Sequence, residues 1–235
     1  MQKTSSKQNS IPQNHYLAIG PCRLKIKKNT FRNLPTSALK EAAFIDGGLS
    51  HLKKLSEYLP NLAHIWSKNP LSYGDGDSAN TPMTYLKKSQ ELSDLRFYLD
   101  KKLKQKKGGI YYLFGFLGKR IDHHLLNVGE ISQFIFQMHK KKCTSIVIVD
   151  QQMIYLPPGN YKLNLRGIFS FMATEDAKVK MKGECKFKIL KNEKIQKMSS
   201  KGLSNTGFGI VQIFSDKSFI LITQKSQSFL TEGIS

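Results

Sequence analysis

The acidic residues of this chain are few, and four of them gather in one short stretch. The sequence holds 17 Asp and Glu against 37 Lys and Arg, yet Asp75, Asp77, Glu91 and Asp94 fall close together. Two carboxylates one residue apart repel each other unless a positive charge lies between them. The glycines that precede the first two let the backbone turn tightly, and Mg²⁺ takes carboxylate oxygens while it keeps positions for phosphate oxygens. The stretch therefore fits a magnesium site, although it also fits a surface turn with a helix cap at Ser78.

The composition indicates a folded and strongly basic protein. The chain has 235 residues, of which 40% are hydrophobic, and a formal net charge of +20. Such a charge favours nucleic acid as a partner when Lys and Arg cluster among aromatic residues. Here the basic residues are scattered, apart from short runs at 101–107 and 140–142. We therefore expect a solvated basic surface that attracts anionic nucleotides, and we do not expect nucleic acid as the partner.

The cysteines and the amino terminus bear on the compartment. Cys22, Cys143 and Cys185 are far apart and form no CxxC pair, which argues against a disulfide framework or a zinc site. Residues 1–14 are polar and lack an apolar core of signal-peptide length, and no apolar run reaches the ~20 residues of a membrane span. We expect a flexible tail at 1–14 in a cytoplasmic protein without a membrane segment.

Residues 15–150 predict an α/β domain with a parallel sheet. Apolar runs at 15–20, 42–45, 110–114 and 144–149 are typical of buried strands, and the patterns at 49–59, 95–103 and 125–138 of helices. Asp46, Gly47 and Gly48 lie between a strand and a helix, where loops of parallel sheets bind nucleotides. A serine directly before Asp94 is placed to cap the helix that Asp94 opens, so Asp94 also has a purely structural explanation.

The glycine-rich loop after the third apolar run offers a second set of polar residues. Arg120 and Asp122 are expected on one side of an extended segment, which favours an ion pair. That pair is either a structural salt bridge or an Arg directed at phosphate and held by the Asp. Lys119 and His123 could each contact phosphate or face solvent, and His123 and His124 cannot both face one ion from a regular helix. The chain contains no G-x-x-x-x-G-K-[ST] motif, which excludes the P-loop mode of phosphate binding.

Beyond Asp150 the pattern changes to short alternating strands separated by Gly, Pro and Asn, with no convincing helix. This pattern predicts a second domain over 151–235, a small antiparallel β-sandwich. Residues 210–214 and 218–223 read as a terminal hairpin joined at 215–217. We expect the second domain to dock on the first or on another copy of the chain.

Several motifs occur in an order that resembles the thiamine pyrophosphokinase family. They are DGG at 46–48, GDGDS at 74–78, QELSDL at 90–95, GFLGKRIDH at 115–123, LPPG at 156–159 and GLSN at 202–205. The resemblance covers most of the chain beyond about residue 42.

The resemblance implies a thiamine diphosphokinase, an enzyme that moves pyrophosphate from ATP to the hydroxyl of thiamine and gives thiamine diphosphate and AMP. It also implies Mg²⁺, an α/β nucleotide domain followed by a β-sandwich, and a homodimer with the site between subunits. By position, magnesium would be held by Asp75, Asp77 and Asp94. The nucleotide side would consist of Asp46, Gly47, Gly48, Ser78, Arg120, Asp122 and His123. The thiamine side would consist of Gln90, Phe187, Ser204 and Asn205.

The chain departs from the family pattern at several positions. Ser93 stands where the family usually has Thr, and Leu92 stands where a polar residue is usual. Phe187 aligns only with a one-residue shift, so it could stack on the thiamine ring or belong to a strand core. Two other functions therefore stay open: a member of the same fold that acts on another alcohol, and a noncatalytic protein that binds nucleic acid through its basic surface.

Overall fold

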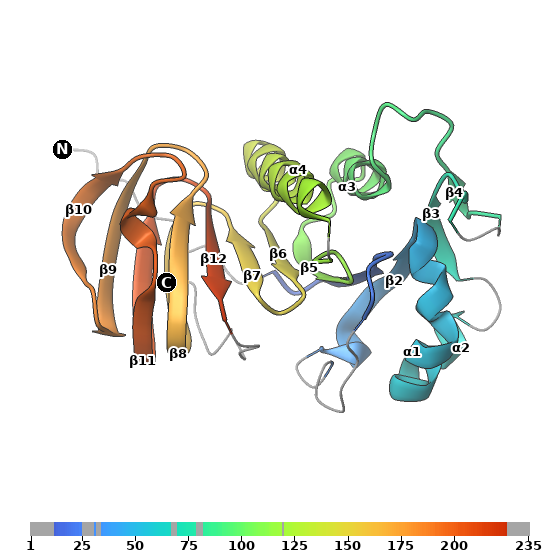
Figure 1. Ribbon diagram of the computed structural model, residues 1–235, viewed down its shortest axis with the longest axis horizontal. Coiled ribbons are helices and arrows are strands. Elements are labelled where there is room, and N and C mark those ends of the chain that lie inside the picture. The colour runs from blue at the N-terminus through green and yellow to red at the C-terminus, as the bar shows by residue number, and fades with distance from the viewer. Residues whose placement is uncertain are drawn as a thin grey trace.

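The chain folds around one mixed sheet. The computed structural model describes residues 12–24, 31, 34–66, 70–78, 82–118 and 120–224, with the backbone alone at 64 and 65. Within these residues, twelve strands are hydrogen-bonded in the order β10-β9-β11-β8-β12-β7-β6-β5-β1-β2-β3-β4. The sheet runs the length of the molecule, and its α-helices lie over the half that holds β1 to β6 (Figure 1). The predicted α/β class is therefore confirmed.

Within the described residues, the parallel half of the sheet is built from six short strands. They are β1 (His15–Ile19), β2 (Leu39–Ile45), β3 (Leu71–Gly74), β4 (Tyr85–Leu86), β5 (Gly109–Phe114) and β6 (Ser145–Val149). One face packs against α3 (Asp94–Lys104) and α4 (Ile121–Lys140), and the other packs against α1 (Leu52–Tyr58) and α2 (Pro60–Trp66). In β1, Tyr16 and Ala18 belong to the first core, and Leu17 and Ile19 belong to the second. Helices on both faces explain why the central strands β1, β5 and β6 are almost entirely buried.

The second half of the sheet is antiparallel. It consists of β7 (Met153–Leu156), β8 (Gly159–Ala173), β9 (Ala177–Cys185), β10 (Ile189–Ile195), β11 (Asn205–Ser215) and β12 (Phe219–Thr223). Short 3-10 helices occupy Thr36–Ala38 (η1), Asp46–His51 (η2) and Ser200–Gly202 (η3). The predicted helix over 49–59 is therefore divided between η2 and α1.

Strand β8 curls back on itself. The rings of Tyr161 and Phe171 both pack on Phe219, with centroid distances of 5.6 and 4.8 Å. In a straight strand, residues ten positions apart would be separated by about 33 Å. The strand must therefore bend between them, and Gly167, with φ of 97°, lies in that interval. The bend folds the antiparallel half around its own core.

The predicted terminal hairpin is wrong, because β11 and β12 are not neighbours. Both pair with β8, which lies between them. Ser215 at the end of β11 pairs with Gly159, whereas Phe219 at the start of β12 pairs with Ala173. The curl of β8 brings its two ends together, so the short segment after Ser215 can cross from one end to the other.

The predicted boundary at Asp150 coincides with the turn between β6 and β7. These two strands pair with each other, so the sheet continues across the boundary. A separate sandwich domain over 151–235 stays a prediction. Most of the expected tail, residues 1–11, lies outside the described residues. No helix in the part of the chain that the structure describes is long and apolar enough to cross a membrane.

Candidate active site

The candidate site lies at the carboxyl ends of the parallel strands. Because β1, β2, β3 and β5 run parallel as neighbours, the loops that follow them meet at one edge of the sheet. These loops begin at Gly20, Asp46, Asp75 and Gly115. The sheet therefore brings together motifs that are far apart in the sequence.

Three carboxylates form a cluster at this edge. Asp46, Asp75 and Asp77 each offer one oxygen, and these oxygens lie within 4.8 Å of one another. Asp46 is only 5% exposed, and its Oδ1 has no hydrogen-bond partner among the described residues. A buried carboxylate oxygen without a donor is costly in a folded protein. The donor set of the cluster fits a bound cation.

Glycine permits the close approach of the two acidic loops. Gly74 has φ of 148°, and a Cβ at this position would lie 2.9 Å from Asp46 Cβ. A Cβ at Gly48 would collide with the carbonyl oxygen of Ile19 in β1, and one at Gly47 would lie 3.3 Å from Ser78 Cβ. The predicted nucleotide loop at 46–48 thus packs directly against the acidic loop at 75–78.

Hydrogen bonds organise the acidic loop. The Asp77 N–H donates to Asp75 Oδ1 at 3.3 Å, and the Ser78 hydroxyl donates to Asp77 Oδ1 at 3.0 Å. Gln90 Nε2 donates to Asp75 Oδ2 at 2.8 Å. The bond from Gln90, with smaller effects from the Asp77 N–H and Lys87, outweighs burial and lowers the pKa of Asp75 to about 2. Asp75 is therefore ionised at neutral pH, as a metal ligand must be.

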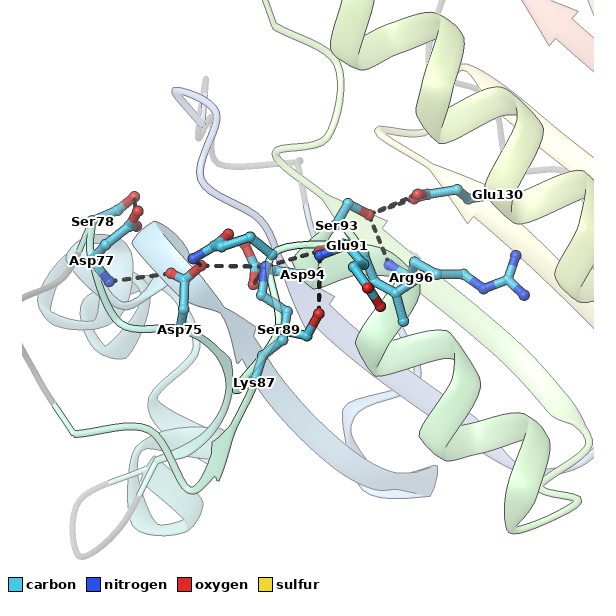
Figure 2. A network of polar contacts seen from close by, with 12 residues as sticks. Asp75, Asp77, Ser78, Lys87, Ser89, Glu91, Ser93, Asp94, Arg96 and Glu130 are labelled. Atoms are coloured by element: carbon cyan, nitrogen blue, oxygen red, sulfur yellow. Dashed lines mark hydrogen bonds and ion pairs between the residues drawn. The ribbon is translucent and has the colours of Figure 1, made fainter.

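Asp94, predicted as the third magnesium ligand, is held by Lys87. Lys87 Nζ lies 2.9 Å from Asp94 Oδ1 and 3.3 Å from Asp75 Oδ2 (Figure 2). Burial raises the pKa of Asp94, against the effect of the ion pair. Burial alone would lower the pKa of Lys87, but the two carboxylates raise it above its ordinary value. The structure thus brings Asp46 into the acidic cluster and gives Asp94 a protein cation as its partner.

The start of α3 is fixed from two directions. Ser93 caps the helix by accepting a hydrogen bond from the Arg96 N–H at 3.0 Å, as the sequence predicts. Its hydroxyl also faces Glu130 of α4, at 2.8 and 2.7 Å from the two carboxylate oxygens (Figure 2). Burial raises the pKa of Glu130. Glu130 and Lys87 were not predicted, because no local spacing links either one to the residues that it contacts.

Arg120 and Asp122 form the predicted ion pair, at 2.5 Å between Arg120 Nη2 and Asp122 Oδ2. The hydrogen bond from Arg120 lowers the pKa of Asp122 to about 2. The expectation of an extended segment holds only for Arg120, the residue directly before α4, because Asp122 lies in the first turn of that helix. Both side chains and His123 are exposed, and Lys119 lies outside the described residues. These groups are accessible at the start of a helix, where anions are favoured.

The Asp150 carboxylate binds the backbone of the glycine-rich loop. Its Oδ1 accepts from the Gly115 N–H at 2.6 Å, and its Oδ2 accepts from the N–H groups of Phe116 and Leu117 at 3.0 and 2.7 Å. Asn127 Nδ2 donates to the Phe116 carbonyl oxygen at 3.1 Å. Three consecutive N–H groups on one carboxylate fix the path of the loop that leads to α4.

The residues expected to face thiamine, other than Gln90, lie in the antiparallel half. Phe187 is 57% exposed, which rules out the alternative of a strand-core position. Asn205 holds its backbone, accepting from the Phe187 N–H at 3.0 Å and donating to its carbonyl oxygen at 2.8 Å. Ser204 is exposed, with φ of 57°, and its N–H donates to Ser170 Oγ at 3.1 Å. Asn205 therefore fixes the backbone of the residue that exposes the Phe187 ring.

These residues are far from the acidic cluster of the same chain. Strands β11 and β3 are eight positions apart in the sheet order. Figure 1 shows them in the two opposite halves of the molecule. A single chain therefore does not bring the two predicted half-sites together.

Solved structures with the same fold include several thiamine pyrophosphokinases. The enzyme from Bacillus subtilis has a TM-score of 0.61 and 21% sequence identity, covering 90% of this chain and 99% of that chain. The enzyme from Candida albicans has a TM-score of 0.63 and 13% identity, with coverage of 89% and 88%. The yeast enzyme has a TM-score of 0.54 and 12% identity, with coverage of 91% and 86%. No family model and no curated protein matches the sequence. The chain therefore has the fold of the thiamine pyrophosphokinases, as its motif order indicates.

Proposed function

We propose that this chain is a thiamine pyrophosphokinase, which transfers a pyrophosphoryl group from ATP to the hydroxyl of thiamine and releases AMP. The observation that carries the proposal is the acidic cluster at the carboxyl edge of the parallel strands, in which the buried Asp46 carboxylate has an oxygen without a partner among the described residues. The likeness of the whole fold to proteins of that name supports the same function.

The donor set of the cluster fits Mg²⁺. Asp46, Asp75 and Asp77 offer three carboxylate oxygens in a shared space, and hard oxygen ligands suit this ion. A cation there would give Asp46 Oδ1 a partner that the described protein groups do not provide. Bound with ATP, Mg²⁺ shares the negative charge of the phosphates and of the departing AMP.

The protein groups position the reactants. In pyrophosphoryl transfer, the thiamine hydroxyl oxygen forms a bond to the β-phosphorus while the bond from that phosphorus to the AMP oxygen breaks. The reaction needs in-line placement and nearby positive charge more than covalent help from the protein. We assign the phosphates to the edge formed by the loop at 46–48, Ser78 and the start of α4, where the exposed Arg120 and His123 can reach them.

We further propose that the complete site forms between two copies of the chain. Gln90 already lies in the acidic network, but Phe187, Ser204 and Asn205 are too distant within one chain to contact the same thiamine molecule. A second copy could present its exposed Phe187 to the acidic edge of the first, and the ring would stack on the heterocycle. The expected homodimer would then have two equivalent sites.

The test is AMP release by the purified protein given Mg-ATP, with and without thiamine. We expect AMP only when thiamine is present, and we expect Asp75→Asn combined with Asp77→Asn to abolish it. Asp216→Asn provides a matched control, because Asp216 is an exposed carboxylate in the antiparallel half. ATP binding without release would refute thiamine as the acceptor. The absence of both ATP binding and AMP release would refute the enzyme assignment.

A further inference from the structure

Lys87 lies between two of the acidic residues and contacts both of them and the loop that precedes Asp94. Its Nζ contacts Asp94 Oδ1 at 2.9 Å and Asp75 Oδ2 at 3.3 Å, and it donates to the Leu92 carbonyl oxygen at 2.9 Å. The two carboxylates are held as ion pairs and the Leu92 carbonyl oxygen by a hydrogen bond; Asp94 Oδ1 itself has no hydrogen bond among the described residues. Figure 2 shows the side chain between the loop of Asp75 and the start of α3.

Backbone pairing fixes this lysine in place. The Lys87 N–H donates to the Gly74 carbonyl oxygen at 2.8 Å, which extends the pairing of β4 with β3. The residue next to Gly74 is Asp75, so the sheet itself sets Lys87 beside that carboxylate. Lys87 is only 7% exposed. It is therefore a built part of the site and differs from its exposed neighbour Lys88.

The position of Lys87 divides the acidic residues into two sets. Asp46, Asp75 and Asp77 share a space in which their oxygens can meet one cation. Asp94 is not a member of that cluster, and Lys87 Nζ lies closer to Asp94, at 2.9 Å, than to Asp75, at 3.3 Å. A carboxylate that is neutralised by a buried ammonium group gains less from a divalent ion, and Coulomb repulsion opposes bringing a second cation close to the first.

We propose that Lys87 withholds Asp94 from the divalent cation, so that the cation is held by Asp46, Asp75 and Asp77 and its affinity is set by Lys87. The proposal rests on the cation site of the proposed function and is independent of the acceptor alcohol. It makes Lys87 a positioning residue: it acts on the cation through the carboxylates that it holds.

The test is a double-mutant cycle on Mn²⁺ binding, measured by calorimetry and by the electron paramagnetic resonance signal of free Mn²⁺, without nucleotide or thiamine. Mn²⁺ serves as the probe because it shares the oxygen-ligand preference of Mg²⁺. Removing the ammonium charge strengthens cation binding in any account, so Lys87→Met alone decides nothing. The cycle adds Asp94→Asn in both backgrounds, since coupling between two residues appears as non-additivity.

We expect Asp94→Asn to weaken Mn²⁺ binding by less than about threefold when Lys87 is present, and by more than about tenfold in the Lys87→Met background, a size typical of changes around metal ligands. Equal losses in the two backgrounds would show that Asp94 ligates the cation already, and would overturn the proposal. Lys88→Met is the matched control and should leave Mn²⁺ affinity within about twofold of wild type, as an exposed charge is screened.

Two further readouts keep the result interpretable. Thermal melting checks that each variant folds, and Lys87→Gln, which keeps an N–H donor for the Leu92 carbonyl oxygen, carries the same test if Lys87→Met does not fold. Failure of wild-type protein to bind Mn²⁺ would remove the cation site itself and this proposal with it. Normal Mn²⁺ binding with no AMP release would instead refute the activity and leave the role of Lys87 standing.

Discussion

Replacing Asp150 by Asn should destabilise the protein by about 2 kcal/mol, although the two side chains have the same shape. The carboxylate accepts from three backbone N–H groups, one on Oδ1 and two on Oδ2. The amide has a single oxygen, which can keep the N–H groups of Phe116 and Leu117. Its NH₂ group then faces the buried Gly115 N–H, and an unsatisfied buried N–H costs about 1 to 3 kcal/mol.

The remaining effects of this substitution oppose each other. Burial raises the pKa of Asp150, although the three N–H groups act in the opposite direction. Because the Asn amide carries no charge, it is less costly to bury than the carboxylate, but its hydrogen bonds to the N–H groups are weaker. We take these two effects as cancelling. The left-handed backbone of Asp150, with φ of 47°, adds no strain, because Asn tolerates that conformation.

The assay is urea unfolding at pH 7 with linear extrapolation to water. Asp216→Asn is the matched control, because Asp216 is exposed and, among the described residues, accepts from one backbone N–H, that of Lys178 at 2.7 Å. We expect the control to stay within about 0.5 kcal/mol of wild type. An Asp150→Asn protein as stable as this control would refute the view that the carboxylate holds the loop.

Three further predictions test other parts of the structure. Ser93→Ala should cost about 1 to 2 kcal/mol in urea unfolding, because α3 loses its cap; Ser93→Thr should restore most of it. The depressed pKa of Asp122, about 2, gives a stability contribution that is present above its ordinary value of 3.8 and is lost as the pH falls through about 2. Arg120→Met should return this pKa toward 3.8, as measured by a carboxyl NMR titration. Gly48→Ala should unfold or strongly destabilise the protein, because its methyl group would collide with β1. Gly129→Ala in α4, which has open space around it, should instead stabilise the protein by about 0.5 to 1 kcal/mol. Thermal melting of the two variants tests this, and equal effects would contradict the packing described.

Four strands of the parallel half could be predicted because their signals are local, whereas β3, β4 and α2 were not predicted. Continuous apolar runs mark strands buried on both faces, and the serine before Asp94 marks the start of α3. The antiparallel half could not be predicted to the same depth. The order of β11, β8 and β12 depends on the curl of β8, and no alternation pattern encodes which strand lies between two others.

The candidate site shows the same limit. The pair Asp75 and Asp77 is visible as a spacing in the sequence, whereas Asp46 joins it only because β2 and β3 are neighbours in the sheet. Lys87 follows a two-residue strand, β4, that has no periodicity to detect. Its contact with Asp94 arises from tertiary structure. The sequence therefore indicated the acidic residues but could not show which of them cluster together and which one pairs with Lys87.

A ³¹P NMR time course of wild-type protein with Mg-ATP and thiamine would test the proposed function most directly, because it identifies both products at once. We expect ATP to be converted into equal amounts of AMP and thiamine diphosphate, with no ADP. Formation of ADP with thiamine monophosphate would contradict attack at the β-phosphorus. Unchanged ATP in the presence of thiamine would contradict the assignment of this acidic edge to pyrophosphoryl transfer.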